Sequence, residues 1–125
     1  MLRNTDAIAT LAVRNLKKAS AFYEDKVGLE RGPGNQKQVI TYKSGNSKLL
    51  VYESKHARTN QATAVTWAVD DVEGTVDRLK AKGVKFERYD FPGVKHEGDV
   101  HVMGNRKNAW LMDPDGNILS IVNKQ

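Results

Sequence analysis

Two stretches of the chain share one pattern of apolar and polar positions. The first begins with residues 8–13, a run of apolar or small residues bounded by polar ones. A short run of this kind favours a buried strand. Apolar side chains then recur at the spacing of one helix face, at Leu16, Ala19, Phe22, Tyr23 and Val27. The pattern predicts a strand followed by a helix.

The ends of this helix carry their own signals. Asn15 precedes it, and an asparagine side chain can accept a hydrogen bond from the free N–H groups of a first helical turn. Gly28 follows it, and glycine adopts the left-handed conformation that ends many helices. We therefore expect the helix to begin after Asn15 and to end before Gly28.

The same layout returns 56 residues later. Asp71 takes the place of Asn15, and Gly83 closes the second helix. The apolar stripe of this helix consists of Val72, Val76 and Leu79. Four pairs of residues coincide at this one offset: Ala12 with Ala68, Val13 with Val69, Asn15 with Asp71 and Leu16 with Val72. The match predicts an internal duplication, with one module at about 1–57 and the other at about 63–125, within a single domain.

The later part of each module predicts further strands. Residues 39–43 and 48–53 flank turn residues at 44–47, and residues 108–112 and 118–122 flank a second turn. Asp113-Pro114-Asp115-Gly116-Asn117 has the proline and glycine positions of a type I turn. The segments 30–38 and 89–106, rich in glycine and polar groups, leave room for a short strand in each module. Each module is then strand–helix–strand–strand–strand.

Composition narrows the class of protein. Of the 125 residues, 39% are hydrophobic and 28% are charged, as in an ordinary globular protein. The absence of cysteine excludes disulfides and thiolate chemistry, and it favours the cytoplasm. The net charge is +5, but the lysines are spread along the chain without interleaved aromatic residues, so we expect no nucleic-acid partner. No apolar run approaches the roughly 18 residues of a membrane span, and we expect no membrane partner.

The order and spacing of these motifs resemble the vicinal oxygen chelate superfamily, which contains glyoxalase I, extradiol dioxygenases, and fosfomycin- and bleomycin-resistance proteins. The resemblance spans nearly the whole chain. Its carriers are residues 11–16, Phe22-Tyr23, 27–29, 69–72, Leu79, Gly83-Val84, Ala109-Trp110 and 113–117. It implies an α+β fold in which two βαβββ modules form a partly open barrel around a cleft. It also implies a homodimer.

Metal-using members of this superfamily hold one divalent ion in the cleft. The resemblance places their first two ligands on Ile8 and Ala64, and the third on Ser120. A fourth position falls on Tyr52 or Glu53, and the sequence leaves that register open. Two hydrocarbon side chains and a neutral hydroxyl cannot replace the ligands that zinc or an octahedral ion needs. We therefore expect neither a metal nor another cofactor.

The residues found at these metal-ligand positions predict a largely apolar cleft instead. Because strand side chains alternate, Thr10 should face the cleft beside Ile8, and Thr66 should face it beside Ala64. Trp67, with the opposite parity, should face the helices. Candidate walls are Tyr42, Tyr52 and Trp110. The expected ligand-binding set is Ile8, Thr10, Tyr42, Tyr52, Ala64, Thr66, Trp110 and Ser120.

The segment 89–106 allows two interpretations. As a strand it would place Glu97, Asp99 and His101 on one face, which is a plausible acid–base cluster. The neighbouring Pro92 and Gly93 favour a polar loop, either flexible or serving as a lid over the cleft. The sequence favours the loop over the strand.

Two functions remain open. The first is metal-free binding of a small hydrophobic or aromatic molecule in the cleft. The alternative is a lyase, isomerase or dioxygenase-type enzyme that uses Glu53 or a lid residue such as His101 as its acid–base group, with or without a displaced metal site.

Overall fold

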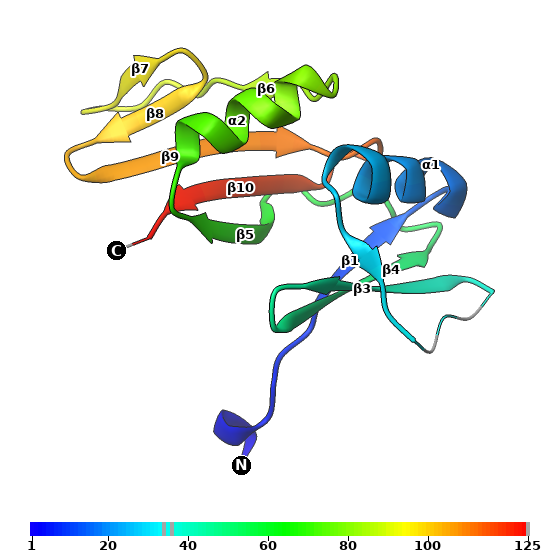
Figure 1. Cartoon of the computed structure of the whole chain (residues 1–125). Helices are drawn as coiled ribbons and strands as arrows, with labels where there is room; N and C mark the ends of the chain where they lie inside the picture. The colour runs from blue at the N-terminus through cyan, green and yellow to red at the C-terminus, as the bar shows by residue number, and fades with distance from the viewer. Residues whose placement is uncertain (34, 36, 125) are drawn as a thin grey trace.

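The computed structural model describes residues 1–33, 35 and 37–124. The chain folds into two β-sheets set at an angle, and the helices lie together over one side of them (Figure 1). This is the α+β arrangement expected from the sequence.

The first sheet has the strand order β1-β4-β3-β2. Its strands are β1 (Ala9–Val13), β2 (Glu30–Arg31), β3 (Val39–Ser44) and β4 (Ser47–Glu53). The central strand β4 runs parallel to β1 and antiparallel to β3. The helix that connects β1 to β2 starts as α1 (Leu16–Ser20) and continues as a π-helix over Ala21–Lys26, which we call η2. The predicted single helix is therefore present, but its second half is wound more loosely.

The second sheet repeats this plan and adds a hairpin. Its order is β5-β10-β9-β8-β7, and β6 pairs with β9 beside β8. The strands are β5 (Thr63–Val69), β6 (Phe86–Glu87), β7 (Lys95–Glu97), β8 (Val100–Met103), β9 (Arg106–Met112) and β10 (Ile118–Asn123), with α2 (Val72–Ala81) between β5 and β6. The preferred interpretation of residues 96–101 as a loop was wrong, because they form the β7–β8 hairpin.

The helix caps expected from the repeat are formed in both copies. Asn15 Oδ1 accepts a hydrogen bond from the Lys18 N–H at 3.0 Å, and Asp71 Oδ1 accepts one from the Gly74 N–H at 2.9 Å. Gly28 and Gly83 end the two helical segments with φ of +85° and +88°. Local sequence chemistry thus fixes where each helix begins and ends.

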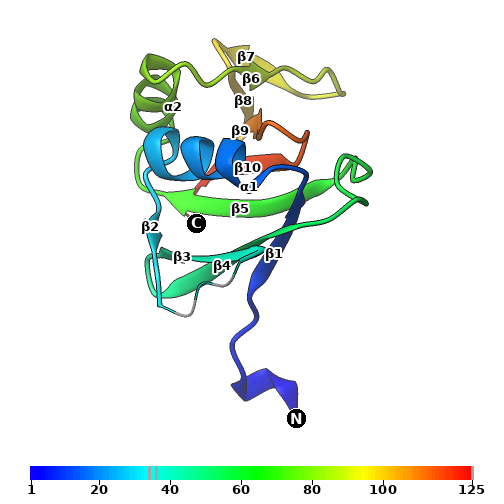
Figure 2. The ribbon, with the colours of Figure 1, turned by 90° about the vertical axis from the view of Figure 1, so that its right-hand side faces the viewer.

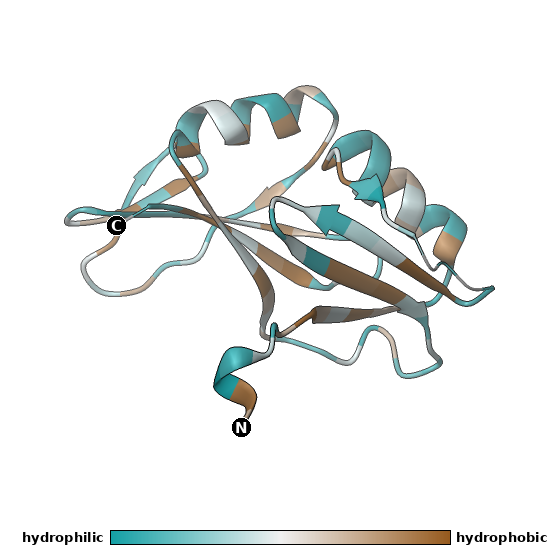
Figure 3. Cartoon of the chain, turned by 60° about the horizontal axis from the view of Figure 1, so that its bottom comes forward, coloured by the Kyte–Doolittle hydropathy of each residue, from teal (hydrophilic) through white to brown (hydrophobic). Residues whose placement is uncertain are grey.

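The core lies between the sheets and the helices. Leu11, Val13 and Val51 of the first sheet are buried on the helix side, and Leu119 and Ile121 occupy the corresponding side of the second. Trp67 also packs against this core, as predicted, and its indole N–H donates to Ser44 Oγ at 2.8 Å. Figure 3 shows the hydrophobic segments concentrated in the strands, whereas the helices are largely polar along their exposed sides.

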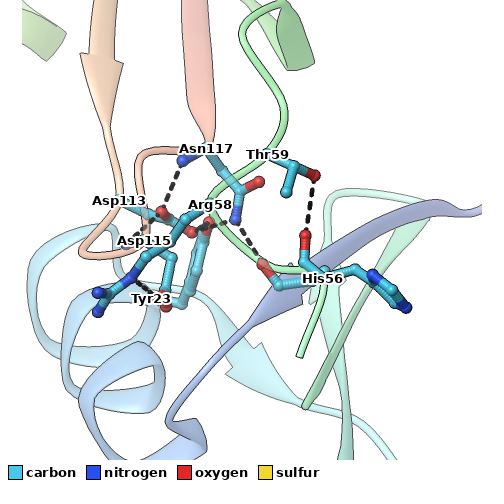
Figure 4. Close-up of polar contacts among 8 residues, drawn as sticks. Tyr23, His56, Arg58, Thr59, Asp113, Asp115 and Asn117 are labelled. Carbon is cyan, nitrogen blue, oxygen red and sulfur yellow. Dashed lines mark hydrogen bonds and ion pairs between the residues drawn. The ribbon is translucent and has the colours of Figure 1, made fainter. Parts of the chain in front are cut away.

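A buried carboxylate joins the two sheets (Figure 4). Asp113 Oδ2 accepts a hydrogen bond from the Tyr23 hydroxyl at 2.7 Å, and Asp113 Oδ1 accepts from the N–H groups of Asp115 and Asn117. The Asn117 amide then donates to the carbonyl of Ala12 at 2.9 Å. The predicted turn at 113–117 is present, and it connects helix η2 and strand β1 of the first sheet to the second.

The N-terminal segment stands apart from this body. Residues 1–8 extend away from the sheets and end in η1 (Leu2–Asn4), a short 3₁₀ turn that buries none of its residues (Figure 2). Across the described part of the chain, no helix is long and apolar enough to cross a membrane.

We predict that Tyr23→Phe will destabilise the protein by about 1–3 kcal/mol, because it leaves a buried carboxylate oxygen without its hydroxyl donor. Burial, with the charge of Asp113, raises the pKa of Tyr23 far above its ordinary value, so the hydroxyl remains a donor over the whole accessible pH range. Urea unfolding measures the change.

Tyr42→Phe is the matched control. Its hydroxyl donates to Glu24, a partly exposed carboxylate that Arg31 also binds, so water and Arg31 compensate for its loss. Equal destabilisation by the two substitutions would contradict the special role of the Asp113 contact.

Candidate functional site

The expected ligand-binding residues are distributed over three hollows rather than one cleft. Ile8, Ala64 and Thr66 line the first, a hollow of about 410 Å³ between the N-terminal segment, the β3–β4 hairpin and β5. Thr10 and Tyr52 line the second, of about 160 Å³, with residues 56–60 and again Ala64. Trp110 lines the third, of about 470 Å³, on the second sheet.

The third hollow, which we call the aromatic hollow, brings together three aromatic rings. It is lined by residues 61–63, Tyr89, Phe91, Met103, Asn108, Trp110 and Ile118. The Tyr89 and Phe91 rings meet the Trp110 ring edge to face, with centroids 5.2 and 6.3 Å away. This geometry favours aromatic contacts, and it leaves ring faces and edges available to a planar ligand.

Strand alternation in β9 builds the floor of the aromatic hollow. Ala109 and Leu111 point into the core, so Asn108 and Trp110 point away from the helices. Ser120 pairs with Trp110 and is buried beneath them, and its hydroxyl donates to Asn108 Oδ1 at 2.9 Å. That bond leaves the amide N–H groups of Asn108 as the polar donors of an otherwise apolar floor.

His101 lies on β8 next to this floor. It is fully buried and pairs with Asn108 on β9. Its ring centroid is 4.8 Å from that of Trp110. Its Nε2 accepts a hydrogen bond from the Tyr89 N–H at 2.8 Å, whereas its Nδ1 is buried without a partner among the described residues. His101 therefore lies buried behind the aromatic hollow, against Trp110 and the backbone of Tyr89, and not on an exposed lid.

The acidic residues of the same hairpin have a structural role. Asp99 lies in the β7–β8 turn, where it pairs with Lys80 of α2 at 2.7 Å and with Arg88 at 3.1 Å. Hydrogen bonds from Lys80 and then Arg88 hold the pKa of Asp99 below its usual range. Glu97 is exposed on β7. The acid–base cluster of Glu97, Asp99 and His101, which was the less favoured interpretation of this segment, does not form a common site.

Tyr42 was placed on the wrong face. It shares its side of β3 with Ile40 and is fully buried beneath the helices, where it packs against Tyr23. Its hydroxyl donates to Glu24. Burial and the neighbouring Glu24 carboxylate raise the pKa of Tyr42, which marks it as a core residue rather than a cleft wall.

Glu53 also lies away from the expected cleft. It has the strand parity of Leu49 and Val51, both buried on the helix side. Its Oε1 lies 3.4 Å from the Leu16 N–H at the start of α1. The residue is exposed at the end of β4, where it lies beside Arg14 and Lys55. A carboxylate in this position is solvated and supports the helix terminus, so its expected role as a base inside an apolar cleft has no geometric basis.

The strand pairing resolves the fourth metal-ligand position. Thr10 pairs with Leu50, and its repeat mate Thr66 pairs with Ser120. Leu50, and neither Tyr52 nor Glu53, is therefore the counterpart of Ser120. In addition, Ala64 falls at an irregularity where the β5–β10 register shifts.

These positions do not fit the divalent ion of the metal-using relatives. Ile8, Leu50 and Ala64 offer only carbon atoms, and the Ser120 hydroxyl is already bound to Asn108. Nowhere among residues 1–33, 35 and 37–124 do three His, Asp or Glu side chains gather closely enough to hold a metal.

Comparison with known proteins agrees with this architecture. The model of the Glyoxalase/Bleomycin resistance protein/Dioxygenase superfamily matches residues 6–121. The chain belongs to this superfamily. YraH of Bacillus subtilis is 29% identical to it in an alignment 125 positions long that covers 89% of this chain and 91% of YraH.

Solved structures of the superfamily share the fold at low sequence identity. The bleomycin resistance determinant encoded on transposon Tn5 superposes with a TM-score of 0.74 at 18% identity, covering 96% of this chain and 98% of that protein. The fosfomycin resistance protein FosX of Listeria monocytogenes gives 0.73 at 15% identity, covering 96% and 93%. Lactoylglutathione lyase of Agrobacterium tumefaciens gives 0.70 at 20%, covering 95% and 92%.

Most residues that line the aromatic hollow escaped the sequence analysis, among them Tyr89, Phe91 and Asn108. Tyr89 and Phe91 lie in an irregular segment, where no periodicity indicates the direction of a side chain. Asn108 was accessible to prediction, since it is two residues before Trp110 in a strand and must share its face.

Proposed function

We propose that the protein binds a small, planar, aromatic or hydrophobic molecule in the aromatic hollow without the help of a metal ion. The observation that carries this proposal is the group of three aromatic rings, Tyr89, Phe91 and Trp110, that lines the hollow beside the Asn108 amide. The volume of about 470 Å³ lies within the range of small-molecule sites in proteins. The superfamily includes proteins that confer drug resistance, such as the Tn5 bleomycin resistance determinant, which is consistent with a binding role.

The residues at the ligand positions support the metal-free part of the proposal. A site without carboxylate or imidazole ligands offers no strong binding to zinc, manganese or iron. The enzymatic alternative loses its first acid–base candidate, because Glu53 lies at the helix side of the first sheet. His101 is close to the hollow, but one of its nitrogens is bound to the backbone of Tyr89.

We further propose that the protein acts as a homodimer. The sides of β1 and β5 that face away from the helices carry exposed small side chains, Thr10, Thr66 and Ala68. These side chains allow a second copy to approach closely. A partner on this face would close the open side of the sheets and bring the first-sheet hollows of one chain near the second sheet of the other.

The binding proposal predicts that Trp110→Ala weakens binding of the fluorescent probe 1-anilinonaphthalene-8-sulfonate at least tenfold. The substitution removes a ring from the floor and both of its aromatic contacts, which together correspond to more than about 1.4 kcal/mol. Fluorescence titration gives the dissociation constant. Met112→Ala is the control, since Met112 is exposed on the same strand outside the hollow; the same loss in both variants would refute the site.

The metal-free proposal predicts less than about 0.1 equivalent of zinc, manganese, iron, nickel or cobalt per chain in protein purified without added metal, because the ligand positions hold no strong donor. Inductively coupled plasma mass spectrometry provides the measurement. One stoichiometric transition metal that survives dialysis would show that a displaced site exists.

The dimer proposal predicts a mass in solution of twice that of one chain, measured by light scattering after size exclusion. Thr66→Lys should shift the protein toward monomer, because a symmetric interface would bury two new charges. Ala81→Lys, an exposed position on α2, should leave the dimer intact. A monomeric wild-type protein at micromolar concentration would contradict the proposal.

A further inference from the structure

Two histidines of the β7–β8 hairpin hold the backbone of Tyr89 from both sides. The Tyr89 N–H donates to His101 Nε2 at 2.8 Å, and the Tyr89 carbonyl lies 3.0 Å from His96 Nε2. His96 and His101 are directly opposed in the hairpin, with ring centroids 4.8 Å apart. One residue of the wall of the aromatic hollow is thus clasped at both of its backbone polar groups.

These contacts determine the tautomer of each ring. A backbone N–H can only donate, so His101 Nε2 must be unprotonated and the proton of the neutral ring lies on Nδ1. A carbonyl can only accept, so His96 Nε2 carries a proton. The clasp therefore requires opposite tautomers in two adjacent rings.

We propose that this pair is a proton-sensitive clasp: neutral His101 holds Tyr89 and Phe91 over the aromatic hollow, and protonation of His101 releases them. This inference rests on the proposed function only in treating the hollow as a ligand site. The clasp itself follows from the hydrogen bonds of the hairpin.

The direction of the pH effect follows from the donor geometry. A proton on His101 Nε2 would point at the Tyr89 N–H. Protonation would therefore replace this hydrogen bond by a repulsive contact between two donors. The charged ring would also be fully buried, with Nδ1 still unpartnered. The closed form therefore excludes the proton and the open form accepts it. Acid stabilises the form that binds more protons, so lowering the pH opens the clasp.

The charged groups around the clasp do not reverse this direction. Asp90 Oδ1 is 3.8 Å from His96 Nε2, and its side chain is exposed to solvent. Asp99 is neutralised by Lys80 and Arg88.

Four further charged groups lie on the surrounding strands. Lys107 of β9 pairs with Glu73 of α2 on the other side of the sheet. Burial and the neighbouring Glu87 carboxylate of β6 raise the pKa of the Tyr89 hydroxyl. Lys95 and Glu97, the neighbours of His96 on β7, are exposed to solvent. None of the charged groups named here accepts a hydrogen bond from His101.

Hydrogen exchange of the Tyr89 amide tests the clasp without any ligand. The protection factor, corrected for the intrinsic pH dependence of exchange, should fall about tenfold between pH 7.5 and pH 5.5, the interval in which histidine side chains change charge. His101→Gln keeps an acceptor near the position of Nε2 but cannot titrate in this range. It should remove the pH dependence, whereas His96→Gln, which keeps a donor toward the Tyr89 carbonyl, should retain it.

Equal protection of wild-type Tyr89 at both pH values would overturn the proposal, as would a tenfold fall that persists in His101→Gln. Should that variant fail to fold, the imidazole ¹⁵N spectrum of the wild type at pH 7.5 decides instead. A proton on Nδ1 of His101 is expected, and a proton on Nε2 would overturn the assignment. Failure of probe binding with an intact clasp would refute the ligand site alone.

Discussion

The contact between Tyr23 and Asp113 is the constraint on which the arrangement of the two sheets depends. Each sheet unit has its own strands and helix, but the carboxylate of Asp113 receives donors from both. Its neighbour Asn117 extends the same network to the carbonyl of Ala12, and Arg58 pairs with Asp115 at its edge. A buried carboxylate is stable only when its oxygens are satisfied, so the turn at 113–117 and the π-helical segment have to meet in one geometry.

The second general constraint is the sidedness of the sheets. Helices cover one face of each sheet, and the large apolar side chains of the strands pack against them. The side chains at the alternate strand positions therefore point to the opposite face. In the first sheet these include Thr10, Leu50 and Tyr52; in the second they include Trp110, Asn108 and the buried Ser120. The segment before the hairpin, which carries Tyr89 and Phe91, lies against this face of the second sheet and forms part of the aromatic hollow.

Much of the fold could be predicted, because its signals are local and repeated. The caps at Asn15 and Asp71 and the 56-residue offset are visible in the sequence and reappear in the structure. The face of β3 on which Tyr42 lies could not be deduced from the sequence, since this strand has apolar residues on both faces, Val39 on one and Ile40 on the other. The β7–β8 hairpin was missed because glycine and charge dominate its sequence, and its anchoring to Lys80 is a contact between distant residues. The clasp on Tyr89 has no sequence signal, because one partner in each bond is a backbone group.

The joint between the sheets also has a consequence for the order of folding. The bonds from Tyr23 to Asp113 and from Asn117 to Ala12 link residues 90 and 105 positions apart. Contacts of such long range have to overcome a large loop-closure entropy, and they tend to slow folding. During synthesis the first sheet leaves the ribosome long before its partner turn exists. The Tyr23 hydroxyl, which is buried in the folded protein, has no Asp113 partner until the turn at 113–117 has been synthesised, so the nascent first unit depends on that later segment.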